Sequence, residues 1–337
     1  YLSLLQHVGQ PAEPIVRVGD RVAKGQLLAM GQGTISAAIH APTSGIIFDI
    51  MEYPATHPSA LPTPTILLEP DGEDLWGEGI QEVDPFSLSP EEISRRVEAA
   101  GVVGLGGAAF PSAVKLNLGR KTRIKTLIIN GGECEPYLTC DDRLMRERAR
   151  DIVDGIRIMM HALQCEETLV GIEDNKPEAF KALTKACDSL DAITIRQVPT
   201  LYPMGWDKQL IGYLTGKEVP AGGRTADIGV LMHNVATVYA VQQAIRYGKP
   251  LISRIVTVSG QAVSKPKNVE ALIGTPLRDL LNYCGFEASR VGRYILGGPM
   301  MGDTLPGIDV PLVKGGCGIL ALTDAELAAS DAKPCIR

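Results

Sequence analysis

Aromatic residues are scarce in this chain, and its basic residues form no cluster. Phe, Trp and Tyr make up 5% of the 337 residues, and the formal net charge is -6 at pH 7. Nucleic-acid-binding domains carry a concentrated basic surface, because contacts to the phosphate backbone supply much of their affinity. The composition therefore argues against nucleic acid as a partner.

Long apolar runs are also missing. No run reaches the roughly 18 to 20 residues that a membrane-spanning helix needs, and no signal segment opens the sequence. We expect a soluble chain without a membrane span of its own, although docking on a membrane protein stays open. The chain starts at Tyr1 rather than Met and stops just after Cys335, so we expect a piece of a longer protein.

The cysteines lack the spacing of a disulfide framework or a metal site. There are seven of them, an odd number, and no C-x-x-C pair occurs. Such scattered thiols are typical of a reducing compartment, which favours the cytoplasm. The five histidines are equally dispersed, so the sequence predicts no complete metal site.

Residues 1–75 have no lysine where a carrier domain needs one. Apolar stretches at 15–29 and 39–47 are separated by turn signals, and the pattern resembles the barrel-sandwich fold of biotinyl and lipoyl domains. The hairpin tip at 30–34 holds no lysine, and Lys24, the only lysine of this segment, lies outside that tip. We therefore expect a structural or docking module rather than a swinging-arm carrier.

Residues 88–250 alternate apolar runs with amphipathic stretches. Ser89 and Pro90 predict the start of a helix, since Ser is a favoured N-cap and Pro a favoured first helical residue. Alternation of strands and helices predicts a largely parallel sheet with helices on both faces. The expected strands are 124–130, 168–173, 193–198 and 228–232, and the expected helices are 141–163, 177–183, a short one after Gly205, and 235–247.

After residue 250 the regular alternation of strand and helix patterns ends. A hairpin, a helix at 275–281 and a returning strand at 293–302 predict a small β-grasp module over 251–303, followed by a tail over 304–337. The expected fold class is thus multidomain α/β, with a β barrel-sandwich module, a central α/β domain and a C-terminal β-grasp module.

Two glycine-rich motifs carry the functional information. The first is G-V-V-G-L-G-G-A-A-F-P at 101–111, and the second is N-G-G-E-C-E-P at 130–136. Glycine lets backbone N–H groups approach a ligand closely, and a phosphate gains most from that arrangement. A helix rather than a strand precedes the first motif, which argues against a standard dinucleotide-binding turn. The second motif follows a parallel strand, so we expect both loops and Lys115 to flank one cleft.

The second motif contains two acidic residues around a cysteine. Glu133 and Glu135 point to the same side of an extended segment, where they would hydrogen-bond a ribose or an amide, or remain two solvated carboxylates. Cys134 has no histidine or cysteine partner in sequence, so we assign it no covalent chemistry.

Five ordered motifs closely resemble the RnfC family, the C subunits of Rnf electron-transport complexes. Besides the glycine-rich motifs, these are G-I-E-D-N-K-P, V-L-M-H-N-V-A-T-V-Y-A-V and G-G-P-M-M-G-D-T-L-P, and the likeness extends to H-A-P-T-S-G near the start. The resemblance runs over essentially the whole chain. RnfC proteins are in turn similar to the flavoprotein subunit of respiratory complex I, which binds FMN and accepts hydride from NADH.

The resemblance implies a flavin site and a nicotinamide site at particular positions. It implies no catalytic acid or base, since hydride transfer belongs to the cofactors. The alternative is that Phe110, Tyr202 and His233 only pack against their neighbours and contact no ligand. The implied FMN-binding residues are Gly104, Gly106, Gly107, Lys115, Asn130, Glu133, Cys134, Tyr202, Gly205, Met232, His233, Asn234 and Thr237, and the implied NADH-binding residues are Phe110, Glu135, Asp207 and Lys208.

Two departures from the related patterns bear on these assignments. The complex I flavoprotein has an arginine at the place of Leu105 and paired glutamates at Trp206 and Asp207, and both departures lie on the nicotinamide side of the implied site. Trp206 would instead stack on a nucleotide base or shield the flavin. The RnfC pattern continues into cysteine motifs that bind two [4Fe-4S] clusters, and Cys335 is the only ligand of that set in this sequence.

The resemblance implies a translocase-class, FMN-dependent oxidoreductase subunit that takes hydride from NADH and passes electrons to iron–sulfur clusters. Its partners would be the other Rnf membrane subunits and the ferredoxin-like subunit, and electrons would exchange with ferredoxin while ions are pumped. The protein would lie peripherally on the cytoplasmic face of the bacterial inner membrane. Two alternatives remain, a cobalamin reductase of similar architecture and a non-catalytic docking subunit whose glycine loops are merely structural.

Overall fold

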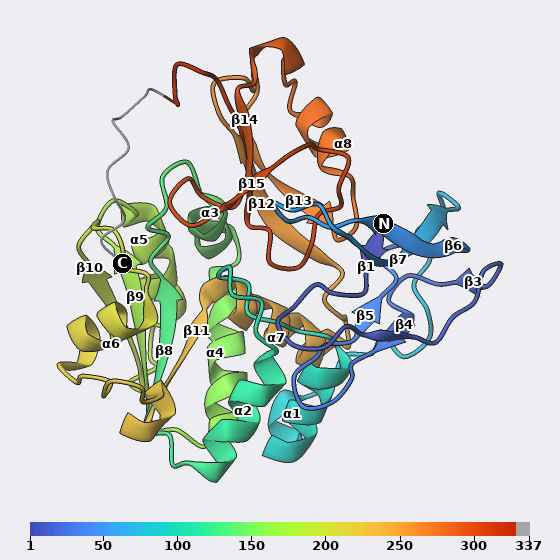
Figure 1. The fold of residues 1–337 in the computed structure, drawn as a ribbon. Coiled ribbons are helices and arrows are strands. Elements are labelled where there is room, and N and C mark those ends of the chain that lie inside the picture. Colours follow the sequence, from blue (N-terminus) through green and yellow to red (C-terminus); the bar gives the residue numbers. More distant parts are fainter. Residues whose placement is uncertain (328–337) are drawn as a thin grey trace.

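The computed structural model describes residues 1–327, apart from the side chains of 118–121. Three parts follow one another along the chain, as Figure 1 shows: a blue β module, a green to yellow α/β layer, and an orange to red sheet module. None of the helices formed by residues 1–327 combines the length and the apolar character that a membrane span requires.

The N-terminal β module consists of two small sheets. The four-stranded sheet has the order β1-β7-β6-β3, and the three-stranded sheet has the order β2-β4-β5. Side chains such as Leu28, Ile39, Ile47 and Ile66 are fully buried within the module. Its strands are β1 (Leu2–Ser3), β2 (Glu13–Pro14), β3 (Arg21–Val22), β4 (Leu27–Met30), β5 (Ile39–His40), β6 (Gly45–Pro54) and β7 (Pro62–Pro70).

The α/β layer is built on a parallel sheet of order β10-β9-β8-β11. Adjacent residues of β8 point to opposite faces, and Ile128 and Ile129 accordingly join different apolar clusters. Ile128 packs with Leu210 of α6, whereas Ile129 belongs to the cluster that contains α4, α5 and α7. The strands are β8 (Thr126–Gly131), β9 (Glu167–Glu173), β10 (Ile193–Val198) and β11 (Val230–Asn234), and the helices named here are α4 (Ala149–Leu163), α5 (Pro177–Ala186), α6 (Asp207–Thr215) and α7 (Val235–Tyr247).

Helices lie on both faces of this sheet, as the alternation predicts. The side chain of Ser89 accepts a hydrogen bond from the amide of Glu92 at 3.2 Å, so the predicted start of α1 (Pro90–Ala99) is confirmed. One prediction is wrong: the helix expected at 141–163 is two helices, α3 (Cys140–Glu147) and α4. Arg148 separates them because its backbone, at φ -122 and ψ 29, is not helical.

As far as residue 327, the C-terminal module has one sheet of order β13-β12-β16-β14-β15 and one α-helix, α8 (Leu277–Tyr283). The segment predicted as a tail differs from expectation, because β16 lies at the centre of this sheet. β16 pairs in parallel with β12 and antiparallel with β14. Its five residues are all buried, which explains why this apolar run is an interior strand. The strands are β12 (Ser253–Ser259), β13 (Lys267–Leu272), β14 (Arg293–Leu296), β15 (Asp303–Leu305) and β16 (Gly318–Leu322).

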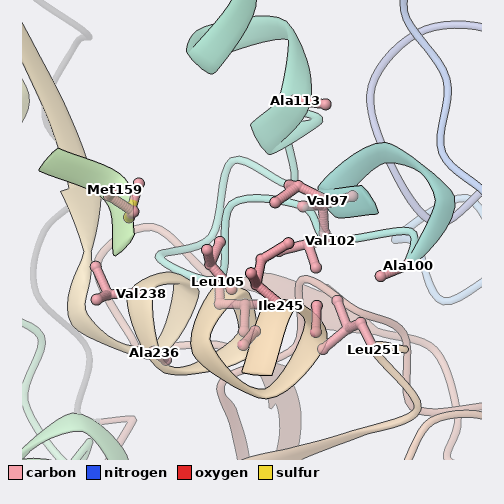
Figure 2. Close-up of a cluster of buried hydrophobic side chains, with 14 of the residues drawn as sticks. Val97, Ala100, Val102, Leu105, Ala113, Met159, Ala236, Val238, Ile245 and Leu251 are labelled. Atoms are coloured by element: carbon pink, nitrogen blue, oxygen red, sulfur yellow. The ribbon is translucent and has the colours of Figure 1, made fainter. Parts of the chain in front are cut away.

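The first glycine-rich motif is attached to the core around α7. Figure 2 shows Leu105 lying beside α7 in a cluster with Val102 and Ile245. This motif connects α1 with α2 (Ser112–Lys121), so it is a loop between helices and not a strand-to-helix turn. Burial of its apolar residues fixes the position of the glycines that follow them.

Candidate flavin-binding site

The predicted flavin residues gather at the carboxyl edge of the parallel sheet. Asn130 near the end of β8 and Asn234 at the end of β11 are register partners on adjacent strands. The first glycine-rich motif reaches this edge from α1, and the segment before α6 reaches it from β10. Loops from four places in the sequence therefore meet where α/β folds place ligands.

The glycine loop, residues 101–111, lies against the start of α7. The amide of Leu105 donates to the Thr237 hydroxyl at 2.8 Å. A Cβ atom added to Gly106 would lie 3.1 Å from the Cβ of Asn234, which is closer than most real contacts. The amide of Gly104 donates to the carbonyl of Phe110 at 2.8 Å and closes the loop. Gly106 therefore packs directly on the N-cap of α7.

The turn of this loop presents free backbone donors. Gly106 and Gly107 are exposed, and Gly107 has φ +103, a conformation that favours glycine. Neither amide has a hydrogen-bond acceptor among the residues that the structure describes. Adjacent free amides of this kind suit an anion such as a phosphate.

Leu105, at the first of the two departures that the resemblance implies, has a side chain that points into the core. The side chain is buried in the cluster around α7, so Leu105 can face the site only with its backbone. The departure at this position therefore changes the interior of the protein rather than the exposed face of the loop.

Lys115 brings a positive charge to the end of β11. Its Nζ donates to the carbonyl of Met232 at 3.2 Å. Burial lowers the pKa of Lys115, and the charge of Asp207 acts in the opposite direction. Within the described residues no carboxylate forms an ion pair with Lys115. A largely buried cation with one carbonyl partner is suited to an anionic ligand.

His233 lies within β11 with its side chain buried. It is buried, and its Nε2 has no hydrogen-bond partner within the described part of the chain. Burial, with a contribution from the charge of Lys115, holds the pKa of His233 well below its usual range. The imidazole is therefore neutral at pH 7, and its prediction as a flavin contact stays a prediction.

Asn130 joins the second glycine-rich motif to the segment before α6. Its Nδ2 donates to the carbonyl of Gly205 at 2.7 Å, and its Oδ1 accepts from the amide of Gly132 at 2.9 Å. Gly205 lies so close that an added Cβ would be 2.5 Å from the carbonyl oxygen of Gly132 and 3.2 Å from the Sγ of Cys134. Asn130 and Gly205 thus fix two loops to each other.

Glu133 caps the start of α3. Its carboxylate accepts from the amides of Asp141 at 2.9 Å and Asp142 at 3.2 Å, and from the thiol of Cys140 at 3.3 Å. Burial, and then the charge of Asp141, raise the pKa of Glu133. Ligand atoms of Glu133, Cys140 and Asp141 lie within 4.8 Å of one another, but the Glu133 carboxylate already accepts from the Cys140 thiol and the α3 amides, and the Asp141 carboxylate accepts from Asn234 at 2.6 Å.

A buried ion pair beneath this loop was not anticipated from the sequence. Lys176 donates to Glu173 at 2.6 Å and to the carbonyl of Glu133 at 3.3 Å. Both residues come from the G-I-E-D-N-K-P motif, for which the sequence indicates no role. Two opposite charges three residues apart at the end of an apolar strand were the sequence signal that could have predicted this ion pair.

The predicted nicotinamide residues are divided between two places. Glu135 accepts from the amide of Met300 at 2.9 Å and lines a cleft of about 640 Å³ with Gly106 and Gly107. Its second oxygen is buried without a partner in the described structure. Asp207 and Lys208 instead begin α6, and no hydrogen bond or ion pair described here joins them to Glu135 or Phe110.

The remaining predicted residues lie at the rim or outside the described structure. Tyr202 and Trp206 are exposed, with 37% and 56% of their surfaces accessible. Burial, and then the charge of Glu135, raise the pKa of Tyr202, which places its phenol near the second glycine-rich motif. Cys335 lies outside the described residues.

Family models match the three parts of the chain in order. The RnfC barrel sandwich hybrid domain matches residues 1–73, the Nuo51 FMN-binding domain matches residues 97–243, and the SLBB domain matches residues 255–304. Together with the observed sheets, these matches confirm the predicted fold class.

Relatives of known name align over the whole chain. It is 53% identical over 337 residues to the C subunit of the ion-translocating oxidoreductase complex of Rhodobacter capsulatus, and 49% identical to the protein of the same name from Klebsiella pneumoniae. The alignments cover 100% of this chain but 65% and 44% of those two relatives. The chain thus spans less than two thirds of their length.

A solved structure has a similar fold. The NAD+-reducing [NiFe]-hydrogenase in its H2-reduced state superposes with a TM-score of 0.61 and 22% sequence identity, over 72% of this chain and 48% of that one. At this identity the likeness concerns the fold alone. Over the length that it spans, the chain belongs to the RnfC family, the C subunits of ion-translocating oxidoreductase complexes.

Proposed function

We propose that this chain binds FMN at the carboxyl edge of the β10-β9-β8-β11 sheet and exchanges hydride and electrons between NAD(H) and that flavin. The observation that carries the proposal is that β11 connects two groups suited to an anion: Lys115, which has no ion pair among the described residues, bonds to the carbonyl of Met232 in that strand, and Gly106, whose amide is free, packs on Asn234 at its end. The match of residues 97–243 to the Nuo51 FMN-binding domain supports it.

The residues present fit an anionic cofactor with a large planar ring. Free amides and the Lys115 cation suit a phosphate. Gly106, Gly132 and Gly205 keep the loops in contact at points where a Cβ would crowd its neighbours. Exposed aromatic side chains of Tyr202 and Trp206 border this edge, where a ring system could stack.

Each group of residues would have its own part in binding. FMN, when bound, supplies the hydride-accepting ring and the ability to release electrons singly. The glycine loop would bind the phosphate, and Lys115 would neutralise its charge. Asn130 and Gly205 would keep the two loops at a fixed separation, and Asn234 would hold α7 beneath them through its capping bonds to Ala236 and Thr237.

The cleft beside the glycine loop is the proposed entry for the nicotinamide nucleotide. It lies between the loop, the N-terminal module and the C-terminal module. The free oxygen of Glu135 would accept a ribose hydroxyl there, because a buried carboxylate oxygen without a partner is costly until it gains one. Phe110, Asp207 and Lys208 remain candidates for the rest of the nucleotide.

The chain is proposed to act as part of a larger assembly. Its relatives are named as subunits of ion-translocating oxidoreductase complexes. We propose the corresponding partners for this chain, at the cytoplasmic face of the inner membrane, with Cys335 as a ligand of a [4Fe-4S] cluster in the complete protein.

Reconstitution with FMN followed by anaerobic addition of NADH tests the proposed function. We expect a retained flavin whose absorbance near 450 nm bleaches with NADH, since flavins lose that band on reduction. Failure to retain flavin would refute the flavin site. A retained flavin that stays oxidised would refute the nicotinamide assignment and leave the flavin site standing.

Replacing Lys115 with methionine should raise the Kd for FMN about 10- to 100-fold. The variant keeps most of the unbranched side chain but removes a charge-assisted contact worth roughly 1.5 to 3 kcal/mol, and about 1.4 kcal/mol corresponds to tenfold. Quenching of flavin fluorescence measures the Kd. Lys181→Met, on the exposed face of α5, is the control and should bind FMN as the unaltered chain does. Equal affinities in all three proteins would contradict the role of Lys115.

A further inference from the structure

Arg254 is a buried arginine at the start of β12 that contacts the glycine loop from another module. Its side chain is 5% exposed. One guanidinium nitrogen donates to the carbonyl of Lys314, and Nη2 donates to the carbonyl of Leu105 at 3.1 Å. A guanidinium presents its donors in a rigid plane, so these two bonds fix the carbonyls relative to each other.

The bond to Leu105 determines the direction of the next amide. The carbonyl of Leu105 and the N–H of Gly106 belong to one planar peptide group, and in a trans peptide they point in opposite directions. Holding the carbonyl toward Arg254 therefore turns the Gly106 amide away from the C-terminal module. Gly106 itself packs on Asn234, at the edge of the sheet where the flavin residues meet.

The other contacts of Leu105 hold the residue itself in place. Its amide donates to Thr237 at 2.8 Å, and its side chain is buried beside α7. Lys314, whose carbonyl Arg254 also holds, donates through Nζ to the carbonyl of Gly101 at 2.7 Å at the start of the loop. The C-terminal module thus holds the loop at two carbonyls.

We propose that Arg254 is a positioning residue for the phosphate of a bound flavin mononucleotide. By holding the Leu105 carbonyl it aims the Gly106 amide at that phosphate, and the C-terminal module thereby sets the phosphate affinity of a site in the α/β layer. This inference rests on the proposed flavin site. It also makes a separate prediction, because the effect of Arg254 is confined to the phosphate end of the ligand.

Comparing FMN with riboflavin isolates that effect, since riboflavin is the same flavin without the phosphate. We expect the unaltered chain to bind FMN about 100-fold or more tightly than riboflavin, as two charge-assisted bonds would give. In Arg254→Met this preference should fall at least about tenfold, with the riboflavin Kd changed less than about threefold. Arg254→Lys, which retains one donor group, should keep an intermediate preference. Arg246→Met removes a partly buried arginine that pairs with Asp154 away from the loop, and should leave the preference unchanged.

The outcomes separate this inference from the proposed function. If the unaltered chain binds neither flavin, the flavin site itself is refuted. If it binds FMN and Arg254→Met keeps the same preference, or loses both ligands equally, the positioning role is refuted while the flavin site stands. Circular dichroism establishes that the variants are folded. If Arg254→Met does not fold, Arg254→Lys decides: a reduced preference supports the role, and an unchanged one overturns it.

Discussion

Valine in place of Gly106 is expected to raise the Kd for FMN at least about 100-fold, the largest effect on ligand binding that the site predicts. Two causes act together. A Cβ at this position would lie 3.1 Å from the Cβ of Asn234, so a branched side chain displaces the residue that caps α7 and donates to Asp141 at 2.6 Å. The added methyl groups also keep a phosphate from the amides of Gly106 and Gly107.

Gly307→Ala is the matched control for this substitution. An added Cβ at Gly307 meets no atom within 4 Å, and its backbone is not in the left-handed region. FMN should therefore bind Gly307→Ala as it binds the unaltered chain, by titration of flavin fluorescence. Binding of FMN by Gly106→Val within about threefold of the unaltered chain would show that the loop does not contact the phosphate.

The free energy of unfolding should rise with pH between about 7 and 8.5, with Lys314 contributing a slope of about 1.4 kcal/mol per pH unit. Lys314 is fully buried, and burial lowers its pKa from 10.5 to about 7. Its Nζ donates to the carbonyls of Ala38 at 2.6 Å and Gly101 at 2.7 Å, which join three modules at one point. The charge of Lys314 also contributes to lowering the pKa of His7 and His40, after burial.

The sign follows from proton binding. Between pH 7 and 10.5 the unfolded chain keeps the lysine proton while the folded chain releases it, so the folded state gains stability as the pH rises. Below pH 7 both states hold the proton, and the burial cost is fully present, at most about 5 kcal/mol. Above pH 8.5 buried thiols such as Cys187, whose pKa burial raises to about 11, lower the stability as the pH rises. His7 and His40, whose pKa values are lowered from 6.5, titrate below pH 7 and do not affect this slope.

Denaturant unfolding at several pH values measures this slope, and comparison with Lys314→Met isolates the contribution of one residue. The methionine variant should lose the Lys314 part of the slope. Lys265→Met, an exposed lysine of the C-terminal module, should keep it. The same slope in Lys314→Met and the unaltered chain would contradict a lowered pKa for Lys314 in the folded protein.

Local signals in the sequence predicted most of the secondary structure. Ser89 and Pro90 marked the start of α1 because capping depends on a few adjacent residues. The apolar run of β8 and the helix at Val235 were similarly local. The break at Arg148 was missed because the residues on both sides suit a helix, so its cause lies in packing rather than in local preference.

The supporting residues of the site were not predictable in this way. Arg254 contacts Leu105 across 149 positions, and Lys314 contacts Gly101 across 213. No periodicity or motif spacing relates such residues, and only the packed arrangement of the modules brings them together. Glu133 shows a related difficulty, because its motif indicated a ligand contact while its carboxylate caps α3. The sequence thus indicates which loops to propose as ligand-binding, but not what holds those loops in place.

The amide signal of Gly106 during an FMN titration tests the central claim most directly. Labelling leucine carbonyls with carbon-13 and glycine amides with nitrogen-15 selects the glycines that follow leucine, which in this sequence are Gly106, Gly119 and Gly297. If the loop binds the phosphate, the Gly106 proton should shift strongly downfield with FMN and little with riboflavin, as a new charge-assisted hydrogen bond requires. A Gly106 signal that does not move while absorbance shows FMN to be bound would contradict the account.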